Sequence, residues 1–61
     1  MKIDEAILEK QCNFPVKVLK NDVLVFSGTI GELQARYDTL GQIEVKNGPA
    51  YIDERYVIEI E

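Results

Sequence analysis

The segment of residues 14–37, FPVKVLKNDVLVFSGTIGELQARY, constrains the fold more than any other part of this chain. Residues 15–20 and 23–27 are rich in Val, Leu and Phe, which are typical of β-strands. Asn21 and Asp22 lie between them and tolerate the positive φ of a type I′ turn. The segment therefore predicts a β-hairpin.

The register of this hairpin follows from its loop. A two-residue turn and a four-residue loop from Lys20 to Val23 are both compatible with the sequence. Either loop places Leu19 opposite Leu24, and Val18 opposite Val25. We therefore expect one register, whichever loop is used.

That register makes both faces of the hairpin apolar, because side chains alternate between the two faces of a strand. One face carries Val16, Val18, Val23 and Val25, and the other carries Leu19, Leu24 and Phe26 with Lys17. In a single small layer one face normally meets water, so the second face requires a cover. A helix, the remaining strands or another subunit could supply it.

A helix is expected directly after the hairpin. Thr29 and Glu32 have the spacing of a capping box, in which each side chain bonds a free backbone amide of the helix start. Apolar residues then recur at helical spacing, at Ile30, Leu33, Tyr37 and Leu40. Gly41 is placed to end the last turn, so we expect this stripe, including Tyr37, to pack on the hairpin.

The rest of the chain supplies further elements. Residues 3–11 have the pattern of a short amphipathic helix, and the alternation in residues 42–47 predicts a half-buried strand. Asn47–Gly48 is a strong hairpin-turn signal. A bend at Asp53–Glu54 then precedes a last strand at residues 56–60.

These elements predict one α+β domain over residues 1–61, in the order helix, strand, strand, helix, strand, strand, with or without a fifth strand. The expected sheet is antiparallel and strongly curved, or a partly open small barrel, with one helix between strands 2 and 3. A chain this short buries only about 60% of its unfolded surface. Since the lone Cys12 excludes an internal disulfide, we expect a homodimer to supplement stability.

Composition limits the function classes. The net charge of −4 argues against sequence-independent binding of nucleic acid, which depends on Lys and Arg to release counterions from phosphates. No apolar run is long enough to span a bilayer, and residues 1–10 lack the apolar core of a signal peptide. We therefore expect a cytoplasmic protein with no membrane partner.

The residue types argue against an enzyme, a metal site and a cofactor. Cys12 has no histidine to activate it, and the chain lacks the ordinary zinc-ligand sets. The neighbouring carboxylates of Asp4–Glu5 and of Asp53–Glu54 point in different directions. Gly28 and Gly31 lack the patterns of phosphate-binding loops, and the capping box already occupies the amides there.

The leading hypothesis is a non-catalytic protein-interaction module, homo-oligomeric, that binds a protein partner through a strand edge or an apolar hairpin face. The candidate partner-binding residues are Leu19, Leu24, Phe26 and Tyr51. Tyr51 is included because a turn at Asn47–Gly48 would place it with Glu44 on the face away from Val45, and tyrosine is enriched in interfaces.

Two alternatives use charged residues. One is an acidic inhibitor that imitates nucleic acid with Asp53, Glu54, Glu59 and Glu61. The other is a small barrel that binds nucleic acid weakly through Lys17, Lys20 and Lys46. Each alternative requires its charged side chains to gather on one surface.

Overall fold

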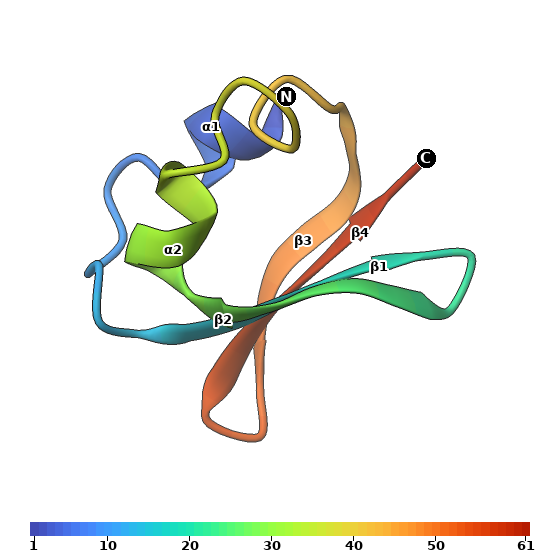
Figure 1. Cartoon of the computed structure of the whole chain (residues 1–61). Coiled ribbons are helices and arrows are strands. Elements are labelled where there is room, and N and C mark those ends of the chain that lie inside the picture. The colour runs from blue at the N-terminus through green and yellow to red at the C-terminus, as the bar shows by residue number, and fades with distance from the viewer.

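Two β-hairpins lie side by side in the computed structural model, which describes residues 1–61 (Figure 1). The first hairpin is β1 (Pro15–Lys20) with β2 (Val23–Thr29), and the second is β3 (Val45–Ile52) with β4 (Arg55–Ile60). The strand order is β2-β1-β4-β3. The predicted α+β class and element order are confirmed, and the curved sheet stays open (Figure 1).

The sheet is mixed, whereas the sequence predicts an antiparallel one. Both hairpins are antiparallel, but Val16–Lys20 of β1 pairs in parallel with Tyr56–Ile60 of β4. Parallel neighbours require a long connection, and here β2, a helix and β3 separate the two strands along the chain. Local turn signals determine only the hairpins, so they could not reveal this central parallel pair.

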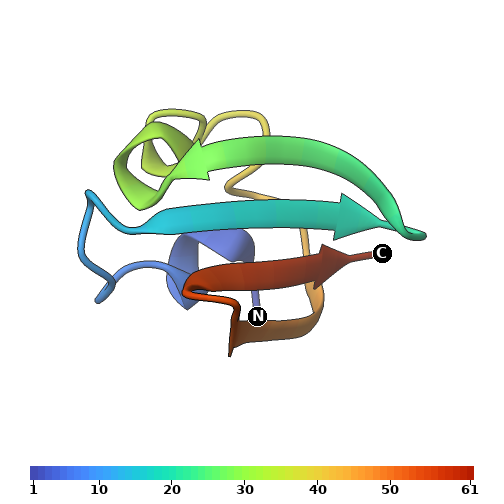
Figure 2. The same ribbon diagram turned by 90° about the horizontal axis from the view of Figure 1, so that it is seen from below.

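Both helices are shorter than the sequence predicts. α1 covers Ile3–Ala6 and α2 covers Ile30–Gln34. The two helices lie on the same side of the sheet, and the view from below shows the strands in front of both (Figure 2). The other face of the sheet is therefore uncovered.

The capping box at the start of α2 is confirmed. The Glu32 N–H donates to Thr29 Oγ1 at 3.2 Å, and the Thr29 N–H donates to Glu32 Oε1 at 3.2 Å. The chain continues beyond α2 as turns until Gly41, whose N–H donates to the Arg36 carbonyl at 3.1 Å. Because the regular helix ends early, Tyr37 leaves the predicted stripe and is 61% exposed.

The core lies between the helices and one face of the sheet. Its eight clustered buried residues are Ile3, Ile7, Val16, Val18, Ile30, Leu33, Ile58 and Ile60. The two central strands supply half of them, and the two helices with the turn after α1 supply the rest. None of the helices combines the length and the apolar character needed to cross a bilayer.

A β-bulge in β2 changes the face assigned to Phe26. Leu19 pairs with Leu24 as predicted, but Val18 pairs with Phe26 and not with Val25. The extra residue shifts the alternation of side chains by one position. Phe26 therefore packs against the core, and Val25 is 43% exposed.

Both hairpins close through two-residue turns with positive φ at both positions. Asn21 and Asp22 have φ values of 51° and 66°, so the predicted turn of the first hairpin is confirmed. Asp53 and Glu54 have φ values of 52° and 63°. The sequence predicts only a bend there, yet this is the turn of the second hairpin.

The predicted hairpin turn at Asn47–Gly48 is wrong. Both residues lie inside β3, where the pairing with β4 has two register irregularities. Gly48 has a φ of 96°, and a Cβ there would lie 2.6 Å from the Val57 carbonyl oxygen. A local irregularity in a strand and a hairpin turn both favour a glycine with positive φ. The sequence Asn47–Gly48 is therefore typical of both.

Candidate interaction surface

The uncovered face of the sheet, here called the outer face, is formed at its centre by β1 and β4. Alternate residues of both strands are buried in the core, so Lys17 and Leu19 of β1 and Val57 and Glu59 of β4 point outward. The parallel register places Lys17 beside Val57, and Leu19 beside Glu59. All four side chains are half-buried, because the edge strands flank them.

Pairing with the edge strands extends the centre of the outer face into two rows. The first row is Leu24, Leu19, Glu59 and Asn47, and the second is Ser27, Lys17, Val57 and Ala50. Their apolar members form a band that crosses the sheet obliquely, here called the apolar diagonal: Leu24, Leu19, Val57 and Ala50. Lys17 lies on one side of this band and Glu59 on the other.

The structure separates the four predicted partner-binding residues. Leu19 and Leu24 pair on the outer face. Phe26 lies on the core face, where the Arg36 guanidinium is 5.5 Å from the centre of its ring. Tyr51 pairs with a residue of β4 that also packs against the core. Only Leu19 and Leu24 therefore lie on the outer face.

Tyr51 belongs to an aromatic cluster with Phe14 and Tyr56. The three ring centroids are 5.1–5.6 Å apart in tilted or edge-on contacts, and Lys10 Nζ lies 5.1 Å from the centre of the Tyr56 ring. Tyr51 is 58% exposed, and the molecule has no pocket. The cluster depends on the turn at Asp53–Glu54, which explains why the predicted register missed it.

The two edges of the sheet differ. β3 contains Lys46 and Pro49, its pairing is irregular, and its first residue, Val45, donates its N–H to the Met1 carbonyl at 2.7 Å. β2 is a seven-residue edge strand without a charged residue or a proline. Its first three side chains are 63%, 55% and 43% exposed. The edge of β2 is therefore the more accessible one.

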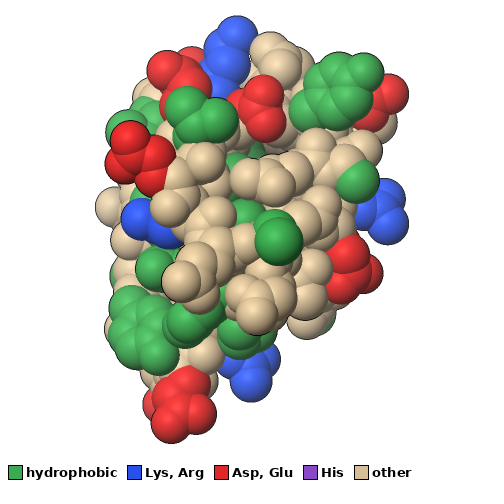
Figure 3. Space-filling view, turned by 90° about the vertical axis from the view of Figure 1, so that its left-hand side faces the viewer, with side chains coloured by type: hydrophobic (Ala, Val, Ile, Leu, Met, Phe, Trp, Pro, Cys, Tyr) green, Lys and Arg blue, Asp and Glu red, His purple; other side chains and the backbone are tan.

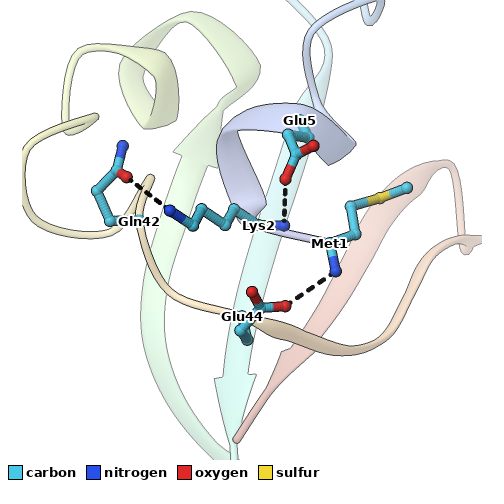
Figure 4. Close-up of polar contacts among 5 residues, drawn as sticks. All are labelled: Met1, Lys2, Glu5, Gln42 and Glu44. Atoms are coloured by element: carbon cyan, nitrogen blue, oxygen red, sulfur yellow. Dashed lines mark hydrogen bonds and ion pairs between the residues drawn. The ribbon is translucent and has the colours of Figure 1, made fainter.

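Polar contacts hold the first residues of the chain against the segment that leads into β3 (Figure 4). The Met1 ammonium donates to Glu44 Oε2 at 2.9 Å, in the one ion pair of the structure. This hydrogen bond, reinforced by charge attraction, raises the pKa of the Met1 amino group and lowers the pKa of Glu44. Lys2 Nζ also donates to Gln42 Oε1 at 3.3 Å.

The amides at the start of α2 already have acceptors. The Ile30 N–H donates to the Phe14 carbonyl at 2.9 Å, and the Gly31 N–H donates to the Cys12 carbonyl at 2.8 Å. Cys12 itself is exposed, and no group of metal-ligating side chains lies together. Figure 3 shows this side of the molecule, where hydrophobic side chains are visible as separate groups.

The charged residues of the two alternative functions do not gather. Asp53 and Glu54 lie at the turn before β4, whereas Glu59 and Glu61 lie at its other end, roughly 20 Å away at about 3.3 Å per residue. The lysines of the nucleic-acid alternative are also dispersed: Lys17 and Lys20 on β1, and Lys46 on β3.

The free edge of β2 and the outer face are therefore the two surfaces that distinguish this molecule. None of the family models, curated proteins or solved structures compared with the chain matches it.

Proposed function

We propose that this protein is a non-catalytic, cytoplasmic interaction module that binds an extended segment of another protein along the free edge of β2. The difference between the two sheet edges carries this proposal. An edge strand presents unpaired N–H and C=O groups, and natural proteins obstruct such edges with lysine, proline, irregular pairing or a covering segment. β3 has all four of these features.

β2 has one irregularity, the bulge at Val25, and is otherwise unobstructed. A segment that adds to this edge gains main-chain hydrogen bonds, while alternate side chains contribute specificity. Leu24 would meet such a segment from the outer face, since it points there and is 55% exposed. The proposal therefore retains Leu24 as a binding residue, with Val23 and Val25 added.

Site-specific photo-crosslinking tests this binding mode. A photo-reactive amino acid replaces Leu24 in one variant and Lys46, on the opposite edge, in the other, and each is irradiated in a lysate of the native host. The photo-reactive residue at position 24 should form a crosslink to an extended segment of one protein. The photo-reactive residue at position 46 should not form this crosslink. A synthetic peptide of that segment should then protect the β2 amides from hydrogen exchange.

Matched lysine substitutions provide the control. Val25→Lys obstructs the β2 edge, and Ile52→Lys places the same charge at a similarly exposed position of β3. Val25→Lys should weaken peptide binding about tenfold or more, and Ile52→Lys should leave it unchanged. Equal capture from both edges, an unprotected β2, or full binding by the Val25→Lys variant would each reject the proposal.

A further inference from the structure

The two charges at the centre of the outer face have no partner of opposite sign within the chain. Lys17 and Glu59 are both half-buried on neighbouring strands, yet the one ion pair of the structure involves neither. Glu59 Oε1 accepts a hydrogen bond from Asn47 Nδ2 at 3.1 Å, which holds the carboxylate on this face. A basic and an acidic group therefore stand on opposite sides of the apolar diagonal, free to pair with another molecule.

The arrangement of these two charges around the apolar diagonal suits a second copy of the same face. Two identical faces can pack across a two-fold axis that lies between them and parallel to both sheets. An axis along the strands would place Lys17 against Val57 and Glu59 against Leu19, so both charges would be buried without partners. An axis along the line from Lys17 to Glu59 would place Lys17 against Lys17 of the second copy, and Glu59 against Glu59, so like charges would meet.

A third axis, along the line from Leu19 to Val57, avoids both the unpaired buried charges and the contacts between like charges. Rotation about it places Leu19 against Leu19 and Val57 against Val57, and it places Lys17 over Glu59 in two equivalent contacts. At about 4.8 Å between strands and about 3.3 Å per residue, the strands of the two sheets cross at about 70°. This angle is close to the orthogonal class of sheet packing.

We propose that a second copy of this chain packs on the outer face across this axis, so that Lys17 of each copy pairs with Glu59 of the other. The surface shares Leu24 with the β2 edge, but this inference does not depend on the binding of another protein there. Four strands of about six residues give a face of about 20 by 20 Å. That area is small for a stable complex, so the expected dissociation constant is on the order of 100 µM.

Charge exchange tests the pairing. Lys17→Glu and Glu59→Lys should each weaken self-association about tenfold or more, because each places like charges together at both contacts. The double variant Lys17→Glu/Glu59→Lys should dimerise like the wild type. An equimolar mixture of the two single variants should form a heterodimer, since both contacts are then complementary. Sedimentation from about 10 µM to about 1 mM measures these four samples and the wild type.

Two further measurements make the result decisive. Circular dichroism establishes that each variant is folded. In NMR spectra of the wild type across the same dilution series, the amide resonances of Leu19 and Val57 should shift with concentration. Val25→Lys, which obstructs the β2 edge, should leave the dimer unchanged. A wild type that stays monomeric, single variants that dimerise normally, a mixture without heterodimer, or a dimer lost only in the Val25→Lys variant would overturn the inference.

Discussion

At the scale of single residues, the two hairpin turns make different demands on their side chains. All four turn residues have positive φ, a region that non-glycine residues visit at a cost of about 1–2 kcal/mol. Asn and Asp adopt positive φ more readily than other non-glycine residues, so this cost is smaller at Asn21, Asp22 and Asp53. Glu54 has a longer side chain without that advantage. It is therefore the most strained residue of the turns.

Replacing Glu54 by glycine is expected to stabilise the fold. The substitution removes the left-handed strain and costs about 0.5–1 kcal/mol of extra chain entropy, so the free energy of unfolding should rise by about 0.5–1 kcal/mol. Asp22→Gly, the matched change in the first turn, should give a smaller gain. Urea denaturation measures both, and a less stable Glu54→Gly variant would contradict this account of the turn.

At the scale of elements, α2 depends on its first turn. A helix of five residues is too short to be stable through its own hydrogen bonds, so its end contacts and its packing must maintain it. Thr29 and Glu32 bond one another's backbone amides, and Ile30 and Leu33 are fully buried in the core. The cap and the core contacts therefore position α2 together.

Removing the cap should have a measurable cost. Thr29→Ala is expected to lower the free energy of unfolding by about 1 kcal/mol, because the Glu32 N–H loses its acceptor. Ser27→Ala removes a hydroxyl from an exposed position of β2 that makes no side-chain hydrogen bond, so its effect should stay within about 0.5 kcal/mol. Equal effects of the two substitutions in thermal denaturation would exclude the cap as a stabilising contact.

The elements also explain which parts of the fold could be predicted from the sequence. The first hairpin turn and the capping box depend on residues at most three positions apart, so the sequence displays them directly. The bulge that moves Phe26 to the core depends on packing against distant residues. Asn47–Gly48 has the chemistry of a turn, but the pairing of β3 with β4 uses it as a bulge.

The same distinction applies to the candidate surfaces. Leu19 and Leu24 could be predicted to share a face because one tight turn sets their pairing. The juxtaposition of Lys17 and Glu59 could not, because it depends on the parallel pairing of β1 with β4. A turn at Asn47–Gly48 predicts Tyr51 on the face away from the core, but the turn at Asp53–Glu54 places it in the aromatic cluster.

At the scale of the whole molecule, stability depends on a small core. Only 10 of the 61 residues are buried, and typical stabilities of about 0.05–0.15 kcal/mol per residue give about 3–9 kcal/mol for this chain. The free energy lost when a few methyl groups are removed from one buried side chain is therefore a large fraction of the total free energy of unfolding. Exposed apolar residues contribute little to this free energy.

Two identical substitutions test this contrast. Ile58→Ala removes a fully buried side chain of a central strand and should cost about 2–5 kcal/mol, enough to leave much of the protein unfolded. Ile52→Ala removes the same atoms at a position that is 51% exposed, and should cost less than about 1 kcal/mol. Comparable losses in urea denaturation would show that the core is not confined to the helix-covered face.

The parallel pairing of β1 with β4 also determines how the chain reaches its fold. Each hairpin joins neighbours in sequence and can form on the timescale of about 1–10 µs. The core closes only when Val16 and Val18 meet Ile58 and Ile60, which lie at the far end of the chain. We therefore expect the two hairpins to form first and then dock, at a rate set by the loss of chain entropy when β1 and β4 meet.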